Sequence, residues 1–304
     1  MLWRRGRRSD NVEDRRGAGG FGGLGGGLGG GFGSSRRGVG LGGGLGLVVI
    51  VVLALLFGVD PTTLLQGLDG TGGYQTEDNR QPGQDSGNMA ATDEKKEFVS
   101  HVLGDTEDTW NTLFQQLGRT YQDPRLVLFS GAIQSACGFA QAAMGPFYCP
   151  ADSKVYIDLS FYDELQRRFQ APGDFAQAYV IAHEVGHHVQ HLLGITDQVD
   201  RQRSRLSKAD ANALSVRIEL QADCFAGIWA HHADSERNLL EEGDVEEALN
   251  AAAAIGDDRL QEQSQGYVVP DSFTHGSSEQ RVKWFKTGWK SGDPTVCDTS
   301  GGLE

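Results

Sequence analysis

Residues 174–194 read DFAQAYVIAHEVGHHVQHLLG, and this stretch decides which kind of fold the chain can adopt. Its apolar side chains recur at three- and four-residue steps, the period of a helix that is buried on one face. The members of this apolar stripe are Phe175, Ala178, Ala182, Val185, Val189 and Leu192. Asp174 can cap the first turn, and Gly194 can end the helix in the left-handed conformation. The stretch therefore predicts one well-bounded core helix.

A second stripe of this helix carries two histidines one turn apart. His183 and His187 are separated by four positions, so both imidazoles project from one face and can share a metal ion. Zinc accepts imidazole nitrogen, and a catalytic zinc site keeps one position open for water. Glu184 follows the first histidine directly and can be the general base that activates this water. The pattern predicts a hydrolytic zinc site; a metal-free, histidine-rich surface helix that includes His188 and His191 is the alternative.

The helix predicted around residues 217–230, RIELQADCFAGIWA, offers a third ligand. Glu219 and Asp223 lie four positions apart on one face of an otherwise apolar segment. Two carboxylates are costly to bury without a cation, and zinc would supply that cation. We expect Glu219 to bind the metal and Asp223 to accept a hydrogen bond from the non-ligating nitrogen of a zinc histidine. The alternative is that both acids face solvent.

The remaining pattern predicts a mostly helical α+β domain. Apolar residues recur at helical spacing from Asp93 to Leu117, with Gly104 as a possible interruption. Short stretches typical of strands follow at residues 125–130, 146–149 and 155–159. Further helices are expected at residues 161–169, 174–193, 206–232, 244–265 and 277–290. A small sheet packed among helices is the expected architecture.

The chain before this domain has a different composition. Residues 1–38 contain eight arginines and three acidic residues, a net charge of +5, and much of the run from Gly17 to Gly46 is glycine. Glycine-rich sequence cannot bury enough apolar surface to fold, so we expect residues 1–38 to form a disordered basic arm. Residues 39–59 carry no charge and are long enough to cross a bilayer as one transmembrane helix. Residues 60–92 are polar and predict a flexible linker to a domain at 93–304.

The charges around the apolar run predict its orientation. Arg36 and Arg37 precede the run and Asp60 follows it, which places the N-terminus in the cytoplasm. The domain would then lie outside the cytoplasm, anchored to the cytoplasmic membrane by a single span. A cleaved signal peptide is the alternative, but residues 1–38 precede the apolar run and no clear small-x-small cleavage site follows it before Asp60.

Four cysteines, Cys137, Cys149, Cys224 and Cys297, test this topology. None forms the close Cys-x-x-Cys pair of a zinc ribbon, so disulfides are expected. Four cysteines permit three pairings. Pairing Cys137 with Cys149 closes a short loop across a predicted hairpin and leaves Cys224 with Cys297 to tie the C-terminal tail to a helix. Buried free thiols are the alternative.

The charge balance argues against a nucleic-acid partner. The whole chain has a formal charge of −14, and the part after residue 38 carries −19. A strongly acidic body repels phosphate groups, and membrane orientation explains the basic arm more simply than DNA does. We therefore expect no nucleic-acid binding.

Two stretches, HEVGHHVQ at 183–190 and ELQADCFAG at 219–227, resemble the bacterial putative neutral zinc metallopeptidase family, within the Glu-zincin group. Further stretches that resemble this family are GPFYCPADSKVYIDLSF (145–161), AAAAIGDDRLQ (251–261) and FTHGSSEQRVKWF (273–285). The resemblance spans most of residues 93–297 and implies a zincin-like domain. It also implies one Zn²⁺ per chain, with the three ligands and the catalytic glutamate named above.

Residues 274–281 contain a Thr-His…Arg element similar to one in membrane-associated Glu-zincins, where the histidine steadies the oxyanion. The resemblance implies this role for His275, and Tyr267 is an alternative donor. A donor aimed at developing negative charge lowers the barrier by about 2.7–4 kcal/mol. His275 also lies just before Ser277, a good N-cap residue, so a local structural role is the alternative. Arg281 can equally pair with a surface acid.

These patterns predict a membrane-anchored enzyme that hydrolyses peptide bonds in a peptide or protein substrate. In such enzymes an extended peptide adds to a sheet edge above the metal helix, and residues 145–159 are the expected hairpin. The alternative is a zinc-binding membrane protein of weak catalytic power that binds a partner or a cell-wall component. A structural zinc site needs a closing fourth ligand and no base, so the presence of Glu184 favours the enzyme.

Overall fold

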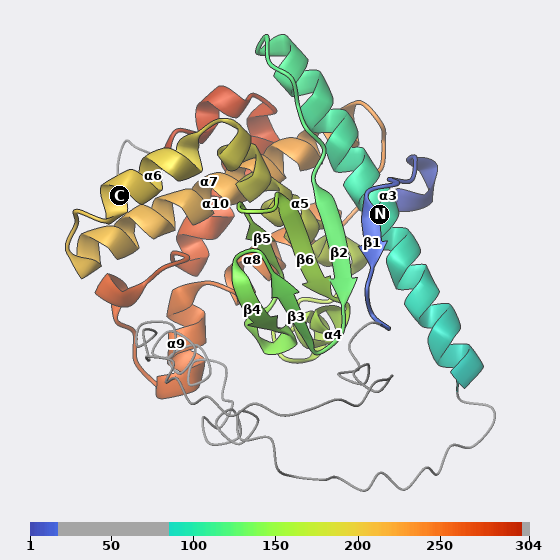
Figure 1. Cartoon of the computed structure of the whole chain (residues 1–304), viewed down its shortest axis with the longest axis horizontal. Coiled ribbons are helices and arrows are strands. Elements are labelled where there is room, and N and C mark those ends of the chain that lie inside the picture. The colour runs from blue at the N-terminus through green and yellow to red at the C-terminus, as the bar shows by residue number, and fades with distance from the viewer. Residues whose placement is uncertain (18–84, 300–304) are drawn as a thin grey trace, which may run out of the picture.

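The protein is mostly helical and contains a small sheet, as the sequence predicts (Figure 1). The structure is a computed structural model that describes residues 1–17 and 85–299. Its helices are α3 (Asp85–Gln116), α4 (Ser160–Arg167), α5 (Asp174–Leu192), α6 (Ile195–Arg203), α7 (Lys208–Ser235), α8 (Asp244–Ala254), α9 (Asp257–Gln265) and α10 (Ser278–Ser291). Short 3₁₀ helices are η1 (Trp3–Arg5), η2 (Ala142–Met144), η3 (Pro270–Ser272) and η4 (Pro294–Cys297). Its strands are β1 (Val12–Asp14), β2 (Arg125–Phe129), β3 (Ala132–Ser135), β4 (Gly138–Gln141), β5 (Phe147–Cys149) and β6 (Lys154–Asp158).

The main sheet has four strands in the order β1-β2-β6-β5. Strands β1, β2 and β6 are parallel, whereas β5 runs antiparallel to β6 and forms one edge of this sheet. Alternate residues of β2 and β6 enter the main hydrophobic core together with the apolar stripe of α5; they are Leu126, Leu128, Val155 and Ile157. The three predicted strands are confirmed. The hairpin of β3 and β4 and the strand β1 were not predicted.

Helix α5 agrees closely with the predicted core helix. Its apolar stripe is buried except for Leu192, which is partly buried, and Gly194 just beyond its end has a φ of 78°, the expected left-handed conformation. The predicted cap is wrong, because the N-cap residue is Gly173. The carboxylate of Glu247 accepts the backbone N–H of Phe175 at 3.1 Å, so a helix distant in sequence satisfies the first turn. The neighbouring Asp174 instead contacts the ammonium group of Met1 at 2.7 Å.

Helices α7 and α10 pack almost backbone to backbone. A Cβ atom on Gly227 would lie 2.1 Å from the carbonyl oxygen of Phe285, and one on Gly288 would lie 2.0 Å from that of Cys224. Only glycine permits this approach. The close packing brings the N-terminal half of α10 against the face of α7 that carries the predicted metal-site carboxylates.

Two predicted helices have different limits in the structure. Helix α3 begins at Asp85 and continues through Gly104, so the linker predicted to reach residue 92 ends earlier. The helix predicted at 244–265 is divided into α8 and α9 by Ile255 and Gly256. A Cβ on Gly256 would lie 2.4 Å from the backbone nitrogen of Ser278, so the break lets the start of α10 approach. Helix α6 was not predicted.

The prediction of a disordered arm over residues 1–38 is wrong for residues 1–17. These residues form η1 and β1, and β1 pairs in parallel with β2. Figure 1 shows this segment lying against α3 and completing the sheet. Met1 and Trp3 are each only 8% exposed. The composition of residues 1–38 misled the prediction because most of its glycine lies beyond Gly17.

The predicted transmembrane helix at 39–59 lies outside the described residues, as does most of the predicted linker. Within residues 1–17 and 85–299, none of the helices combines the length and the apolar character that a membrane crossing requires.

Both predicted disulfides are present. Cys137 pairs with Cys149, joining the turn between β3 and β4 to the edge strand β5. Cys224 on α7 pairs with Cys297 in η4, which ties the C-terminal part of the described chain to α7. The alternative of free thiols is therefore wrong.

Candidate metal centre

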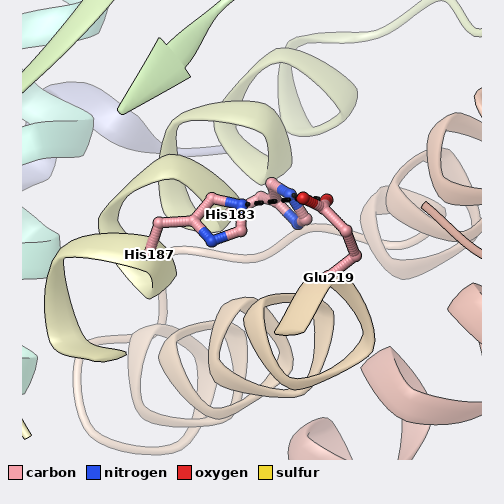
Figure 2. A group of neighbouring side chains, drawn as sticks. All are labelled: His183, His187 and Glu219. Atoms are coloured by element: carbon pink, nitrogen blue, oxygen red, sulfur yellow. Dashed lines mark hydrogen bonds and ion pairs between the residues drawn. The ribbon is translucent and has the colours of Figure 1, made fainter. Parts of the chain in front are cut away.

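Three side chains from two helices converge on one point. His183 and His187 project from α5, and Glu219 projects towards them from α7 (Figure 2). The Nε2 atom of His183 lies 3.2 Å from Glu219 Oε2, and the Nε2 atom of His187 lies 3.5 Å from Glu219 Oε1. One donor atom from each residue falls within 4.8 Å of the others. The structure thus brings together the three predicted ligands in an arrangement that one ion can bridge.

A glycine inside the histidine motif allows this convergence. Gly186 lies between the two histidines, and a Cβ on it would be 3.0 Å from the carbonyl oxygen of Ala222 and 3.1 Å from its Cα. Helices α5 and α7 therefore cross with their backbones close together. Because the crossing point is one turn from Glu219, a side chain of ordinary length reaches the two imidazoles.

The second nitrogen of each histidine already has a partner. His183 Nδ1 lies 2.9 Å from Asp223 Oδ1, and His187 Nδ1 lies 2.9 Å from Gln190 Oε1. The amide of Gln190 donates in turn to the carbonyl oxygen of Ile218 at 2.7 Å, which fixes its orientation. Each Nδ1 therefore carries a proton, and each Nε2, which faces Glu219, is the nitrogen left to bind a metal. The contact predicted for Asp223 is present.

Asp223 belongs to a buried network that the sequence did not predict. Its side chain is fully buried, and the guanidinium of Arg281 donates to both of its oxygens, at 2.8 Å from Nε and 2.9 Å from Nη2. The hydroxyl of Tyr179 donates to Asp223 Oδ1 at 2.5 Å. Burial raises the pKa of Asp223, but the charges of Arg281 and His183 outweigh burial and hold that pKa below its usual range. Asp223 therefore stays a carboxylate that orients the His183 ring.

The charges of the three converging residues suit a divalent cation. Burial lowers the pKa of His183, but the carboxylates of Asp223 and Glu219 raise it to about 10. Burial raises the pKa of Glu219, yet the two histidines hold it well below its usual range. Without metal the centre is thus a cluster of protonated imidazoles around a carboxylate. A divalent cation can replace these protons, so metal binding and proton release are coupled.

Glu184 lies beside this cluster on α5. It is 8% exposed and lines the same cavity, of about 540 Å³, as the three converging residues. Burial raises the pKa of Glu184, against the opposing charges of His187 and His183. A carboxylate with a raised pKa is suited to exchange protons near neutral pH.

His275 lines the same cavity from the loop before α10. Its Nδ1 lies 3.2 Å from Asp257 Oδ1, while the other oxygen of Asp257 accepts the backbone N–H groups of Thr274 (2.7 Å), His275 (2.6 Å) and Gly276 (3.1 Å). Asp257 is the first residue of α9, so the break between α8 and α9 positions it. Tyr267 is 60% exposed and is not among the residues that line the cavity.

The edge strand β5 is fixed above α5 by two further histidines. The hydroxyl of Tyr148 lies 3.0 Å from His188 Nδ1 and 2.7 Å from His191 Nδ1. His188 Nε2 also donates to the carbonyl oxygen of Gln122 at 2.6 Å. Burial lowers the pKa of His188 to about 4, so its ring is neutral at neutral pH. These two histidines support the sheet edge and are not part of the converging group.

Several residues of the centre were missed; they are Tyr148, Tyr179, Gln190, Asp257 and Arg281. Gln190 contacts His187 within α5, whereas the other four act across the tertiary structure. Arg281 stood in the quoted Thr-His…Arg element, but its partner Asp223 lies 58 positions away. Tyr148, Gln190 and Asp257 lie in stretches that resemble the family, but the resemblance assigned them no role. The one available indication was a polar residue inside a segment otherwise expected to be buried.

Comparison with known proteins agrees with this geometry. The model of the family described as "Putative neutral zinc metallopeptidase" matches residues 1–300. The chain belongs to this family. It is 52% identical over 306 residues to "Uncharacterized protein YpfJ" of Escherichia coli strain K12, covering 99% of each chain. It is 40% identical over 258 residues to "Uncharacterized protein Rv2575" of Mycobacterium tuberculosis strain H37Rv, covering 81% of this chain and 84% of the relative. No solved structure matches the chain.

Proposed function

We propose that this protein is a zinc-dependent peptidase that hydrolyses peptide bonds with an activated water molecule. The observation that carries the proposal is the convergence of His183, His187 and Glu219 at a cavity that the buried carboxylate of Glu184 also lines. Membership of the zinc metallopeptidase family supports the same reaction. A zincin-like fold is part of this proposal, because the paired histidines lie on a core helix below an antiparallel edge strand.

The donor set fits zinc. Two imidazole nitrogens and one carboxylate oxygen form a ligand set typical of catalytic zinc, and each imidazole is oriented by a polar partner on its far side. His183, His187 and Glu219 would hold one Zn²⁺ per chain. When bound, the zinc supplies Lewis-acid chemistry, polarising a carbonyl group and lowering the pKa of water.

Glu184 is the base in this proposal. Its carboxylate accepts a proton from the attacking water and delivers it to the amine that leaves when the C–N bond breaks. Burial supports both steps because it raises the pKa of Glu184. The free-energy difference between the protonated and ionised carboxyl group near neutral pH is therefore smaller.

His275 is the proposed donor to the oxyanion. Burial lowers the pKa of His275, but Asp257 and Glu219 raise it above its usual value; the protonated ring donates from Nδ1 to Asp257 and can donate from Nε2 to the carbonyl oxygen as negative charge develops on it. Asp257 also accepts three consecutive backbone N–H groups of the loop, so it positions the whole segment that carries His275. Tyr267 is less suited to this role because it lies outside the cavity lining.

The substrate is a peptide or protein in an extended conformation. Strand β5 is bonded to β6 on one side, and among residues 1–17 and 85–299 no strand pairs with its other side. Tyr148 of this strand lines the cavity together with His183. A peptide that adds to β5 as a further strand would therefore pass over the metal centre.

The apolar run at 39–59 is the proposed membrane anchor. The two disulfides support a metal centre outside the cytoplasm, since disulfides persist in oxidising compartments. The enzyme would then act on peptides or proteins on the outer side of the cytoplasmic membrane.

The test is Glu184→Gln in the full chain, with Glu164→Gln as the matched control because Glu164 lines the same cavity. Zinc content is measured by elemental mass spectrometry, and cleavage is measured on a mixed peptide library. We expect one zinc per chain in all three proteins, and a fall in kcat/KM of about 10²–10⁴-fold for Glu184→Gln alone. Zinc binding by the wild type without cleavage of any peptide would instead favour a non-catalytic binding module.

A further inference from the structure

Residues 1–17 are bound along α3 and β2 as an integral part of the metal domain. We infer that the surface formed by α3 and β2 is the binding site of the chain's own residues 1–17, and that these residues and the metal centre therefore lie on the same side of the membrane. This inference does not depend on the proposed peptidase activity, because it rests on contacts remote from the metal centre. It reverses the side of the membrane predicted for the N-terminus.

The first support is a glycine in the middle of α3. Gly104 costs this helix about 1 kcal/mol relative to alanine. A Cβ at this position would lie 2.8 Å from the carbonyl oxygen of Arg7 and 3.1 Å from the backbone nitrogen of Ser9. The N-terminal backbone thus crosses α3 at Gly104, where α3 presents no side chain.

The second support is a carboxylate that this segment buries. The side chain of Glu107 on α3 is 1% exposed. It accepts hydrogen bonds from Ser9 Oγ at 2.6 Å, from Asn11 Nδ2 at 2.9 Å and from Arg7 Nη2 at 2.7 Å. A buried carboxylate needs such partners, and here three side chains of the N-terminal segment supply them.

The third support is the continuation of the segment into the sheet. Val12, Glu13 and Asp14 pair in register with Leu126, Val127 and Leu128 of β2. The carboxylate of Glu13 forms ion pairs with Lys154 of β6 at 3.0 Å and with Arg125 of β2 at 3.2 Å. The segment therefore adds both backbone and side-chain bonds to two strands of the domain.

These contacts also account for the basic residues that suggested a cytoplasmic arm. Ion pairs join Arg4 to Glu94, Arg7 to Glu107 and Asp108, Arg8 to Glu97, Arg15 to Glu13, and Arg16 to Asp14. Five of the six arginines of residues 4–16 thus pair with acidic groups, and Arg5 donates to the carbonyl oxygen of Asn238. The charge of residues 1–17 is therefore explained without the membrane, whereas Arg36 and Arg37, from which the orientation was predicted, lie outside the described residues.

The position of the apolar run in the sequence limits how it could cross the membrane. Residues 39–59 lie between β1 and α3 in sequence, so a single crossing there would separate two segments that are hydrogen-bonded to each other. Two helical crossings would need about 40 apolar residues, and this run is 21 residues long. Residues 1–17 and the metal domain therefore lie on the same side of the membrane.

Labelling of single added cysteines tests the shared side. Asp10→Cys reports on the N-terminal segment and Arg119→Cys on the metal domain; both positions are exposed, and the four native cysteines are paired. A membrane-impermeant maleimide is applied to intact bacterial cells that express the full chain, and again after permeabilisation. We expect both positions to react in intact cells. Reaction of both only after permeabilisation would keep the shared side but contradict the extracytoplasmic placement, whereas reaction of one position alone would overturn the inference.

Gly104→Ala in the purified full chain tests the contact itself. An alanine in an unobstructed helix raises the melting temperature, whereas a methyl group against the backbone of Arg7 lowers it. We expect a lower melting temperature for Gly104→Ala and unchanged zinc content. Thr112→Ala, at an exposed position of the same helix, is the control. A higher melting temperature for Gly104→Ala would show that residues 1–17 are not bound there.

Discussion

The metal centre and the N-terminal binding surface are each built around one buried carboxylate, but they were not equally visible in the sequence. Asp223 orients a metal-site histidine, and its partner Arg281 is buried as deeply as Asp223 itself, with side chains 2% and 0% exposed. Glu107 binds the N-terminal segment, and its charged partner Arg7 is 45% exposed. A motif on one helix revealed the first region, whereas no local pattern indicated the second.

Two acids that are buried to a similar degree can therefore differ in the free energy lost when each is removed. Removing Asp223 leaves a guanidinium that has no route to water, because the residues around it belong to the packed core. Removing Glu107 leaves an arginine that can turn into solvent. The first region should therefore be intolerant of change in both fold and metal binding, and the second in stability alone.

The largest effect is expected for Asp223→Ala. It should lower the free energy of unfolding by about 3–5 kcal/mol, because Arg281 remains buried without its counter-charge. Zinc affinity should also fall about 10–100-fold, since His183 loses its orienting partner. Urea denaturation and zinc competition measure the two effects.

The control for Asp223→Ala is Asp163→Ala, which removes an exposed ion pair with Lys95. Its cost should be about 0–1 kcal/mol. A similar cost for the two variants would show that the Asp223 network is not what stabilises this region.

The next effect is kinetic and should be confined to the metal centre. His275→Ala should lower kcat about 10²–10³-fold without loss of zinc, because a donor to the oxyanion is removed. Asp257→Asn should lower kcat less, since the ring is retained but loses the negative charge beside Nδ1. Steady-state kinetics with zinc analysis measures both. Tyr267→Phe is the control, and a large loss of kcat in that variant would assign the donor role to Tyr267 instead.

A smaller effect is expected for Glu107→Ala at the N-terminal binding surface. Ser9 and Asn11 lose their acceptor, which should lower the free energy of unfolding by about 1–3 kcal/mol. Zinc content and kcat should remain those of the wild type. A loss of zinc in this variant would show that the two regions are coupled and that the N-terminal binding surface affects more than stability.

The smallest effect is a pH dependence at β1. Burial raises the pKa of Glu13, but bonds from Lys154, Arg15 and Arg125 lower it to about 2, from an ordinary value near 4.5. Because the folded pKa is lowered, the stabilisation is complete above about pH 4.5 and is lost as pH falls towards 2.

Glu13→Gln should therefore flatten the fall in melting temperature between pH 4.5 and 2, with Glu262→Gln, an exposed acid on α9, as the control. The melting temperature is recorded across this range for each protein. Equal slopes for the wild type and Glu13→Gln would contradict the role given to this side chain.

Much of the metal centre could be predicted because its geometry is local. His183, Glu184 and His187 share one helix, so the helical period alone determines which side chains face the same way. Glu219 required one further step, since two acids on an apolar helix imply a nearby cation. Strands β2, β5 and β6 were also predicted, because alternation and turn residues are local.

The sequence by itself determined the core helix, the paired histidines, the mostly helical class and the expectation that the four cysteines form disulfides. Only the tertiary structure decided which groups meet: Arg281 donates to Asp223, Asp257 accepts from His275, and residues 1–17 bind Glu107. The physical reason is that periodicity reports which face of an element is buried but not what is packed against that face. Partners 18, 58 and 100 positions apart are set by how the elements pack. Glycines allow the closest approaches: Gly186 where α5 crosses α7, and Gly104 where residues 7–9 cross α3.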